Sequence, residues 1–283
     1  MQSWLRAAFG ILLFAGSALA GPVNMFSTDI VVPGAGRGPG AAGSSWITDL
    51  WIRCPGGGSV TLEFHAMDSV SAAATASTTL SMTGPVAYLP DVLLNNFSLQ
   101  SGVGNIRIIP SSPATATIRV YSSGSGGGSY GFAFMGMPSA MGMESFSGMM
   151  GQNEDEHRYY VAGLLPEPAA RVNTMVVNSS SSAISGSVDV LDADDSDPSS
   201  GPRSYSFSIQ PYSSHQFLDV LAGVHSRFPG DTGLQLRIHL DDGTPGMMMA
   251  LATVVDNVTN DAYVVMGSMM DAATMMGQGG GMP

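Results

Sequence analysis

Methionine clusters are the feature of this sequence whose residue type and spacing come closest to a chemical site. Between residues 135 and 157, six methionines are separated mainly by small residues, and the segment ends on an acidic stretch and a histidine. Thioethers are soft ligands that suit Cu(I) and need no deprotonation, and Met-x-Met spacing allows two of them to converge on one ion. The candidate copper ligands are Met135, Met137, Met141, Met143, Met149, Met150 and His157.

Two other interpretations fit the same methionines. Methionine is a flexible filler of irregular gaps in a core, and a second cluster after residue 265 has the spacing of one face of a short helix. Exposed methionine also consumes oxidants by forming the sulfoxide. The sequence therefore leaves packing, copper binding and oxidant buffering open, with packing favoured.

A run of aspartates in the second half is a candidate for weak calcium binding, because Ca²⁺ prefers oxygen ligands at alternating positions. The spacing departs from the EF-hand pattern, since Ser196 stands at a ligand position and no glycine or distal glutamate follows correctly. A solvated hairpin loop is therefore the favoured interpretation of this run. The aspartates concerned are Asp192, Asp194, Asp195 and Asp197.

Enzyme motifs are sparse, and we predict a protein without catalytic residues or a bound cofactor. The segment 127–131 matches G-x-S-x-G, but it lies in a Gly/Ser-rich turn, whereas a nucleophile elbow requires a strand, a turn and a helix. The five histidines show no paired metal-ligand spacing. Cys54 is the only cysteine, which excludes an intramolecular disulfide and suggests a packing role.

The elements that position these residues are predicted to be β-strands. Apolar and polar residues alternate over 60–65, 115–121, 205–209 and 234–241, which is the period-two pattern of a strand with one buried and one solvated face. On this basis His65 and His239 fall on solvated faces. Turn-forming Gly, Ser, Pro and Asp clusters separate the runs. Packed antiparallel sheets, and hence an all-β fold, are the expected result.

The two halves of the chain repeat each other, which indicates an internal duplication of one module. Four landmarks recur in the same order with similar spacing. The corresponding segments are 46–55 and 170–179, 90–93 and 218–221, 104–109 and 233–239, and 116–122 and 250–257. Each Asp-Val-Leu landmark is predicted to form a short helical turn.

The domain organisation follows from these patterns. Residues 1–20 are typical of a secretory signal peptide, with an early arginine, a short apolar run and an Ala-x-Ala cleavage site. The apolar run is too short to anchor the protein in a membrane, and no later segment is long and apolar enough to span one. The predicted parts are a signal peptide (1–20), a β-sandwich module (21–134), a flexible Met/Gly linker (135–157), a second β-sandwich module (158–268) and a Met/Gly tail (269–283).

Several of these motifs also resemble a family of uncharacterised secreted proteins of environmental bacteria, which carry tandem immunoglobulin-like modules. The resemblance rests on the 32–36 and 45–50 segments, the Asp-Val-Leu element and the Gly-x-Ile-Arg-Ile strand, and in the second half on 171–178 and 253–261. Ile47 and the Cys54-Pro55 pair replace the arginine and the Asn-Pro turn typical of that family. The resemblance implies immunoglobulin-like sandwiches and extracytoplasmic placement, and it implies no catalytic activity.

Composition narrows the function further. A net charge of −12 with only ten Lys and Arg residues argues against nucleic acid, because phosphate binding requires clustered cations. Only 11% of the residues are charged, a low-charge composition that favours contact with other surfaces. We therefore expect a secreted or periplasmic bacterial protein with a structural, adhesive or protein-binding role, whose partners are other proteins or cell-surface components. The alternatives are copper(I) binding and carbohydrate binding through Trp46, Trp51 and tyrosines.

Overall fold

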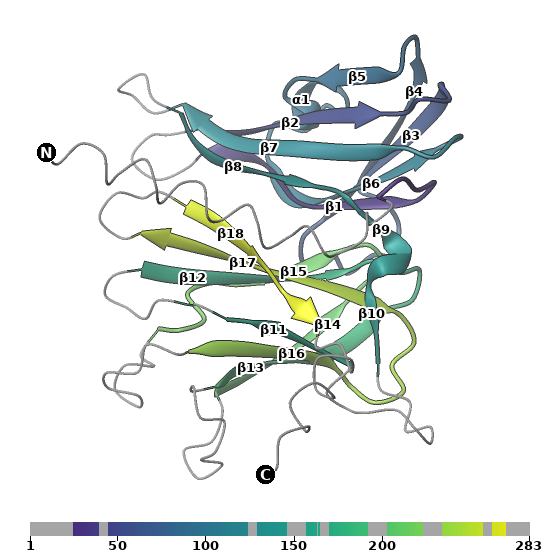
Figure 1. Cartoon of the computed structure of the whole chain (residues 1–283). Coiled ribbons are helices and arrows are strands. Elements are labelled where there is room, and N and C mark those ends of the chain that lie inside the picture. The colour runs from purple at the N-terminus through teal and green to yellow at the C-terminus, as the bar shows by residue number, and fades with distance from the viewer. Residues whose placement is uncertain are drawn as a thin grey trace, which may run out of the picture.

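The chain folds almost entirely into antiparallel β-strands, and its first and second halves lie one above the other (Figure 1). The computed structural model describes residues 25–39, 45–123, 129–145, 157–162, 164, 170–191, 203–222, 234–256 and 262–269. The all-β fold expected from the alternating patterns is confirmed. Within the described residues, no helix is long and apolar enough to cross a membrane.

The first half contains nine strands, one short α-helix and a 3₁₀ turn in its described part. The strands are β1 (Ile30–Pro39), β2 (Ser45–Arg53), β3 (Gly58–Ala66), β4 (Ala76–Met82), β5 (Val86–Leu89), β6 (Gly102–Pro110), β7 (Thr115–Ser123), β8 (Ser129–Met135) and β9 (Met137–Pro138). Helix α1 (Val92–Asn95) follows β5, and the 3₁₀ turn η2 (Ser139–Met141) follows β9.

These strands form two sheets that pack face to face. One sheet has the order β4-β3-β6-β1, with β9 paired to β1, and the other has the order β5-β2-β7-β8. Strand β1 links them, because its last two residues pair with β2 while residues 30–32 and 35–37 pair with β6. The change of course follows a register shift between Val32 and Ala35, where Gly34 has a φ of 71° that most other residues avoid.

The core of the first half lies between these two sheets. The apolar residues of β3 and β7 point into it, as the alternating patterns predicted, and apolar side chains of β1, β2 and β6 join them. Its largest fully buried side chains are those of Ile30, Leu50, Ile52, Leu62, Phe64, Leu93, Ile106, Ile108 and Ile118. Burying a side chain of this size stabilises the fold by roughly 1.5–3 kcal/mol.

The second half begins at Met143 and contributes ten strands in its described part. They are β10 (Met143–Glu144), β11 (Arg158–Val161), β12 (Ala170–Asn178), β13 (Ile184–Leu191), β14 (Arg203–Ile209), β15 (Ser214–Phe217), β16 (Gln235–Leu240), β17 (Met247–Asp256), β18 (Ala262–Met266) and β19 (Ser268–Met269).

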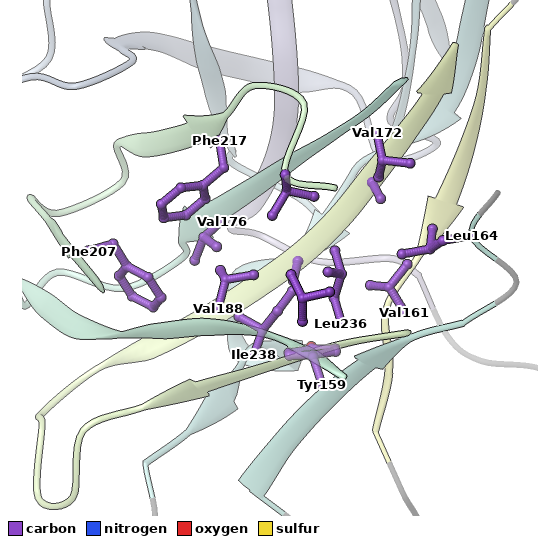
Figure 2. Packing of buried hydrophobic residues seen from close by; sticks show 14 of the residues in the cluster. Tyr159, Val161, Leu164, Val172, Val176, Val188, Phe207, Phe217, Leu236 and Ile238 are labelled. Atoms are coloured by element: carbon purple, nitrogen blue, oxygen red, sulfur yellow. The ribbon is translucent and has the colours of Figure 1, made fainter. Parts of the chain in front are cut away.

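Two sheets again enclose a core. One has the order β14-β13-β16-β11-β19, and the other has the order β15-β12-β17 with β10 and β18 both paired to β17. Figure 2 shows Tyr159, Val188, Leu236 and Ile238 of the first sheet on the opposite side of the core from Val172 and Val176 of the second. Phe207 and Ile209 of β14 belong to the same core as Leu236 and Ile238 of β16, so the predicted inward positions of both strands are confirmed.

The strand order of one half repeats that of the other. The order β4-β3-β6-β1-β9 corresponds to β14-β13-β16-β11-β19, and β5-β2-β7-β8 corresponds to β15-β12-β17-β18. A detailed contact repeats too. Asp91 and Asp219 have left-handed φ values of 41° and 46°. Their N–H groups each donate to a side-chain oxygen at 3.0 Å, that of Asp49 in the first half and that of Asn173 in the second.

The Asp-Val-Leu landmarks differ in one respect from the prediction. Val92 and Leu93 lie in the short helix α1, as expected. In the second half, Val220 and Leu221 lie in a hydrogen-bonded turn, where the Val220 N–H donates to the Val172 carbonyl and the Ala222 N–H donates to the Asp219 carbonyl. Both pairs of apolar side chains are buried. What the two landmarks share is therefore a pair of apolar side chains in a core, and not a helix.

A third apolar cluster lies between the halves. It joins the outer face of β1 to the outer faces of β12, β17 and β18, and its members are Val31, Met67, Met137, Met175, Val177, Tyr212, Met249, Leu251 and Val264. Hydrogen bonds run beside it, from Asn105 Nδ2 to the Tyr212 carbonyl at 2.9 Å and from Ser213 Oγ to the Ala66 carbonyl at 2.7 Å. The two halves therefore share a packed interface.

This interface overturns the placement predicted for His65. The side chain points away from the core of its own half, as the alternation requires, but it is only 3% exposed. The ring of Tyr212 lies 5.5 Å from the histidine ring, measured between centroids. The second half covers this part of β3, so the outer face of the strand is not solvated. His239, by contrast, is partly exposed, as predicted.

The segment expected to be a flexible linker is structured in its described part. Residues 135–145 supply the end of β8, the strands β9 and β10 and the 3₁₀ turn between them. Strand β9 pairs with β1 of the first half, and β10 pairs with β17 of the second. The connection is extended and paired to both halves, which corrects the expectation of flexibility for these residues. The module boundaries themselves remain predictions.

Candidate binding face

The methionines proposed as copper ligands lie in different environments. Met135 is 55% exposed at the end of β8, and Met141 is 39% exposed in the 3₁₀ turn. Met137 packs in the cluster between the halves, and Met143 is buried in the core of the second half. Met149 and Met150 lie outside the described residues. The structure therefore divides the described methionines between packing and surface positions.

The other predicted ligands add little to a copper site. His157 lies beside β10, with its Nδ1 3.2 Å from the Glu144 carbonyl oxygen. Met143 and Met248 are register partners of β10 and β17, and both are buried in the same core. This arrangement is that of gap-filling thioethers in a hydrophobic core.

The remaining metal and nucleophile candidates are placed as follows. The calcium candidates Asp192, Asp194, Asp195 and Asp197 all lie outside the described residues. Among the residues that the structure describes, no three His, Cys, Asp or Glu side chains are grouped to hold a metal ion. Ser129, the serine of G-x-S-x-G, begins strand β8 in register with Ser123 of β7. Cys54 is buried, and its thiol points at the Gly57 carbonyl oxygen at 3.3 Å.

Partly buried ion pairs lie on the outer faces of the other sheets. Arg107 on β6 pairs with Asp29 at 2.9 Å and with Glu63 at 3.3 Å, and its guanidinium lies 3.9 Å from the centre of the Tyr212 ring. In the second half, Arg237 on β16 pairs with Asp189 on β13 at 3.1 Å. Both arginines join the two central strands of their sheet, which is a structural role.

Asp189 is the most strongly perturbed carboxyl group of the described residues. Burial by itself would raise its pKa, but hydrogen bonds from His239 and Ser204 and the charge of Arg237 outweigh burial and lower the pKa to about 2. The same hydrogen bond raises the pKa of His239. The ordinary explanation for such a group is an ion-pair network that stabilises the sheet.

The outer face of the β5-β2-β7-β8 sheet is a different kind of surface. Alternation along these strands sends one set of side chains into the core and the other set outward. We name the outward set the aromatic face. It consists of Ile47, Asp49, Trp51, Arg53, Val86, Tyr88, Thr115, Thr117, Arg119, Tyr121 and Met135.

Two rings stack at one end of the aromatic face. Trp51 and Tyr88 are register partners on β2 and β5, and their rings are stacked with centroids 4.9 Å apart and planes inclined by 22°. Tyr88 is 52% exposed, and Trp51 is partly exposed. The pair presents an amphipathic surface, because each ring has an apolar body and a polar tip.

A buried carboxylate holds the tyrosines in place. Asp49 is 4% exposed, although it lies on the outward side of β2. Its Oδ2 accepts a hydrogen bond from the Tyr88 hydroxyl at 2.9 Å, and its Oδ1 accepts one from the Asp91 N–H at 3.0 Å. This hydrogen bond raises the pKa of the Tyr88 phenol. Burial, reinforced by the charge and hydrogen bonding of Asp49, raises that of Tyr121.

Two guanidinium groups complete the aromatic face. Arg119 lies 4.4 Å from the centre of the Tyr121 ring, and Arg53 lies 5.5 Å from the centre of the Phe26 ring. Both arginines are exposed. Asp49 is the only acid among the named members of this face, beside two arginines, on a chain whose net charge is −12.

The corresponding face of the second half is covered. Strand pairing makes Met175 the counterpart of Trp51. Trp51 pairs with Tyr88 of β5 and Thr117 of β7. Met175 pairs with Gln216 of β15 and Leu251 of β17, the strands that correspond to β5 and β7. Met175, Val177, Met249 and Leu251 are all buried against the first half. Of the two equivalent faces in the described structure, the aromatic face is therefore the exposed one.

The sequence indicates part of this face, since Trp51 and tyrosines are carbohydrate candidates by residue type. The stacking of Trp51 on Tyr88 is not visible in the sequence, because the two residues are far apart along the chain. Trp46, another carbohydrate candidate, instead packs partly buried against the first core. The usable signal was the outward phase of 47–53 and 115–121, which carries a tryptophan, a tyrosine and two arginines.

Comparisons with known proteins add little. No family model matches the chain, and no curated protein matches it. Among solved structures, the chain is similar to a lectin from Pleurotus ostreatus in complex with GalNAc, with 11% sequence identity and a TM-score of 0.22 over 88% of this chain and 83% of the lectin. At this TM-score the similarity carries no argument about fold or function.

Proposed function

We propose that this protein is a non-enzymatic, secreted or periplasmic binding protein made of two duplicated immunoglobulin-like β-sandwich modules, and that it attaches to its partner through the aromatic face. The repeated strand order and the repeated contact of Asp91 and Asp219 support the duplication. Export and the bacterial family resemblance rest on the sequence motifs described above.

The observation that carries the proposal is the contrast between the two equivalent faces. One is buried in the interface between the halves, and the other is exposed with stacked rings and two arginines. Tryptophan, tyrosine and arginine are the residues most enriched at binding hot spots. A sheet face of this composition supports an adhesive role better than a catalytic one.

The copper(I) alternative draws less support from the structure. Met137 and Met143 are used in two separate hydrophobic clusters, and the exposed thioethers described in the segment are those of Met135 and Met141. Titration of the mature protein with Cu(I) under anaerobic conditions, against a competing chelator, tests this alternative directly. Competition that is lost when Met135 and Met141 become leucine would establish it.

Binding of the labelled, full-length mature protein to intact cells and envelope fractions of the source organism tests the main proposal. We expect saturable binding that falls by at least about tenfold when Trp51 and Tyr88 are both replaced by alanine. Tyr263→Ala is the matched control, because Tyr263 is a 48% exposed tyrosine on β18, outside the aromatic face. Absence of binding, or binding that the double substitution leaves unchanged, would refute the proposal.

A further inference from the structure

We propose that the aromatic face binds carbohydrate chains, so that the attachment suggested above is to a polysaccharide. This inference rests on the proposed function and names its ligand class. The carrying observation is the juxtaposition, on one exposed sheet face, of the Trp51–Tyr88 stack with the Tyr121–Arg119 pair.

The two equivalent faces carry different residue types at matched positions. Where the second half has Val177, Met249 and Leu251, strand pairing places Arg53, Thr115 and Thr117 in the first half. The aliphatic set lies in a dry interface with another protein surface. In an interface lined only by aliphatic groups, hydroxyl and guanidinium groups would lose their water without gaining partners, which is costly. The aromatic face is therefore suited to a partner that itself offers hydrogen-bonding groups.

A sugar presents both apolar and polar groups to the surface that binds it. A pyranose ring has an apolar face of C–H groups and a rim of hydroxyl groups, so it needs a flat apolar surface with hydrogen-bonding groups beside it. The aromatic face supplies both, since its rings carry phenol and indole tips and are flanked by threonines and arginines. A purely aliphatic surface would satisfy only the first need.

The aromatic face is longer than one sugar ring. Tyr88, Trp51 and Thr117 are register partners on three adjacent strands, and Tyr121 lies four residues further along β7. At about 3.3 Å per residue, the backbone of Tyr121 lies roughly 13 Å along the strand from that of Thr117, although the Tyr88 and Tyr121 side chains both reach Asp49. The outward positions of β2 and β7 extend from Arg53 and Thr115 to Ile47 and Tyr121, about 20 Å, which is longer than one monosaccharide. The face is therefore suited to several consecutive sugar units of a chain.

The Tyr88 ring is held in place by a hydrogen bond to Asp49. Rings contribute most to binding when they are held in place before the ligand arrives. The Asp49 carboxylate accepts a hydrogen bond from the Tyr88 hydroxyl and another from the Asp91 backbone N–H, which fixes the position of the Tyr88 ring. Its counterpart Asn173 makes the same backbone contact. Asp49 is thus a positioning residue, and Asp49→Asn preserves the contact that the fold already makes with asparagine.

Affinity electrophoresis of the purified mature protein tests the inference. The gels contain soluble polysaccharides of defined type: a mixed-linkage β-glucan, xylan, galactomannan, pectin and alginate. We expect at least one of them to retard the wild type, and we expect Trp51→Ala or Tyr88→Ala to weaken that retardation by about tenfold or more. Trp51→Phe, which keeps a ring, should retain most of it. Tyr263→Ala should behave as the wild type, and far-UV circular dichroism checks folding.

Three outcomes separate this inference from the proposed function. No retardation by any polysaccharide, together with cell binding that depends on Trp51, would overturn the carbohydrate assignment and leave a protein partner. Retardation that persists in Trp51→Ala and Tyr88→Ala would also overturn it. Self-association that Trp51→Ala abolishes, without polysaccharide binding, would identify a second copy of the chain as the occupant and would overturn it as well.

Discussion

The ion pair of Asp189 and Arg237 makes the free energy of unfolding of the second half depend on pH in the acidic range, and one substitution should remove this dependence. Asp189 is buried on β13, and its Oδ2 accepts hydrogen bonds from Arg237 Nε at 3.2 Å and Nη2 at 3.1 Å. Asp189→Asn keeps the size of the side chain and removes its charge. The change therefore isolates the contribution of the carboxylate.

The magnitude follows from the pKa. The folded state lowers the pKa of Asp189 from 3.8 to about 2, which corresponds to roughly 2 kcal/mol of stability for the ionised form. Because the folded pKa is the lower one, this stability is present above pH 4 and is lost as the pH falls from about 4 to 2. The asparagine variant lacks it at every pH.

Urea unfolding at a series of pH values measures the difference. We expect Asp189→Asn to be less stable than the wild type by about 2 kcal/mol at pH 5 to 7, with the gap closing toward pH 2. Far-UV circular dichroism reports both halves. Tryptophan fluorescence reports the first half, since the tryptophans are Trp4, Trp46 and Trp51. A gap that stays constant down to pH 2, or one below about 0.5 kcal/mol at pH 7, would refute the reasoning.

Three further outcomes are expected. Met143→Ala should lower the free energy of unfolding by about 2–5 kcal/mol, because it opens a cavity in a core. Met135→Ala, at an exposed position, should change it by less than about 0.5 kcal/mol. Equal effects of the two substitutions in urea unfolding would contradict this. Asp49→Asn should lower the pKa of the Tyr88 phenol, measured by ultraviolet titration, and an unchanged titration curve would exclude the hydrogen bond as the cause. Burial lowers the pKa of His65, so the folded state holds this side chain neutral at a pH where the unfolded chain binds a proton. The free energy of unfolding should therefore fall as the pH drops below 6.5. His65→Gln should remove that loss in thermal unfolding measured from pH 7 to pH 5.

Much of the strand architecture could be predicted because the relevant signal is local. Alternation in β3, β7, β14 and β16 correctly identified which side chains enter each core. The four repeated landmarks also fall on corresponding elements of the two halves. The methionine segment was harder, because its Gly, Ser and Met composition is typical of a linker and says nothing about pairing. Its strands β9 and β10 form only because β1 and β17 offer them partners.

The assembly of the aromatic face could not be predicted from the sequence for a related reason. Trp51 and Tyr88 come together because β2 and β5 are neighbours in the sheet, and Asp49 reaches Tyr88 for the same reason. The residue types were visible in the sequence, but their convergence depends on strand order. Strand order is a property of long-range pairing that periodicity does not encode.

The sequence by itself determined which side of each strand faces a core, because a period of two leaves only two choices and apolar burial selects one. It did not determine what covers the other side. Tertiary structure decided that the outer face near His65 and Met175 would be buried between the halves and that Trp51 and Tyr88 would stay exposed. The physical reason is that covering an outer face requires a second surface, whose position depends on how the two halves pack.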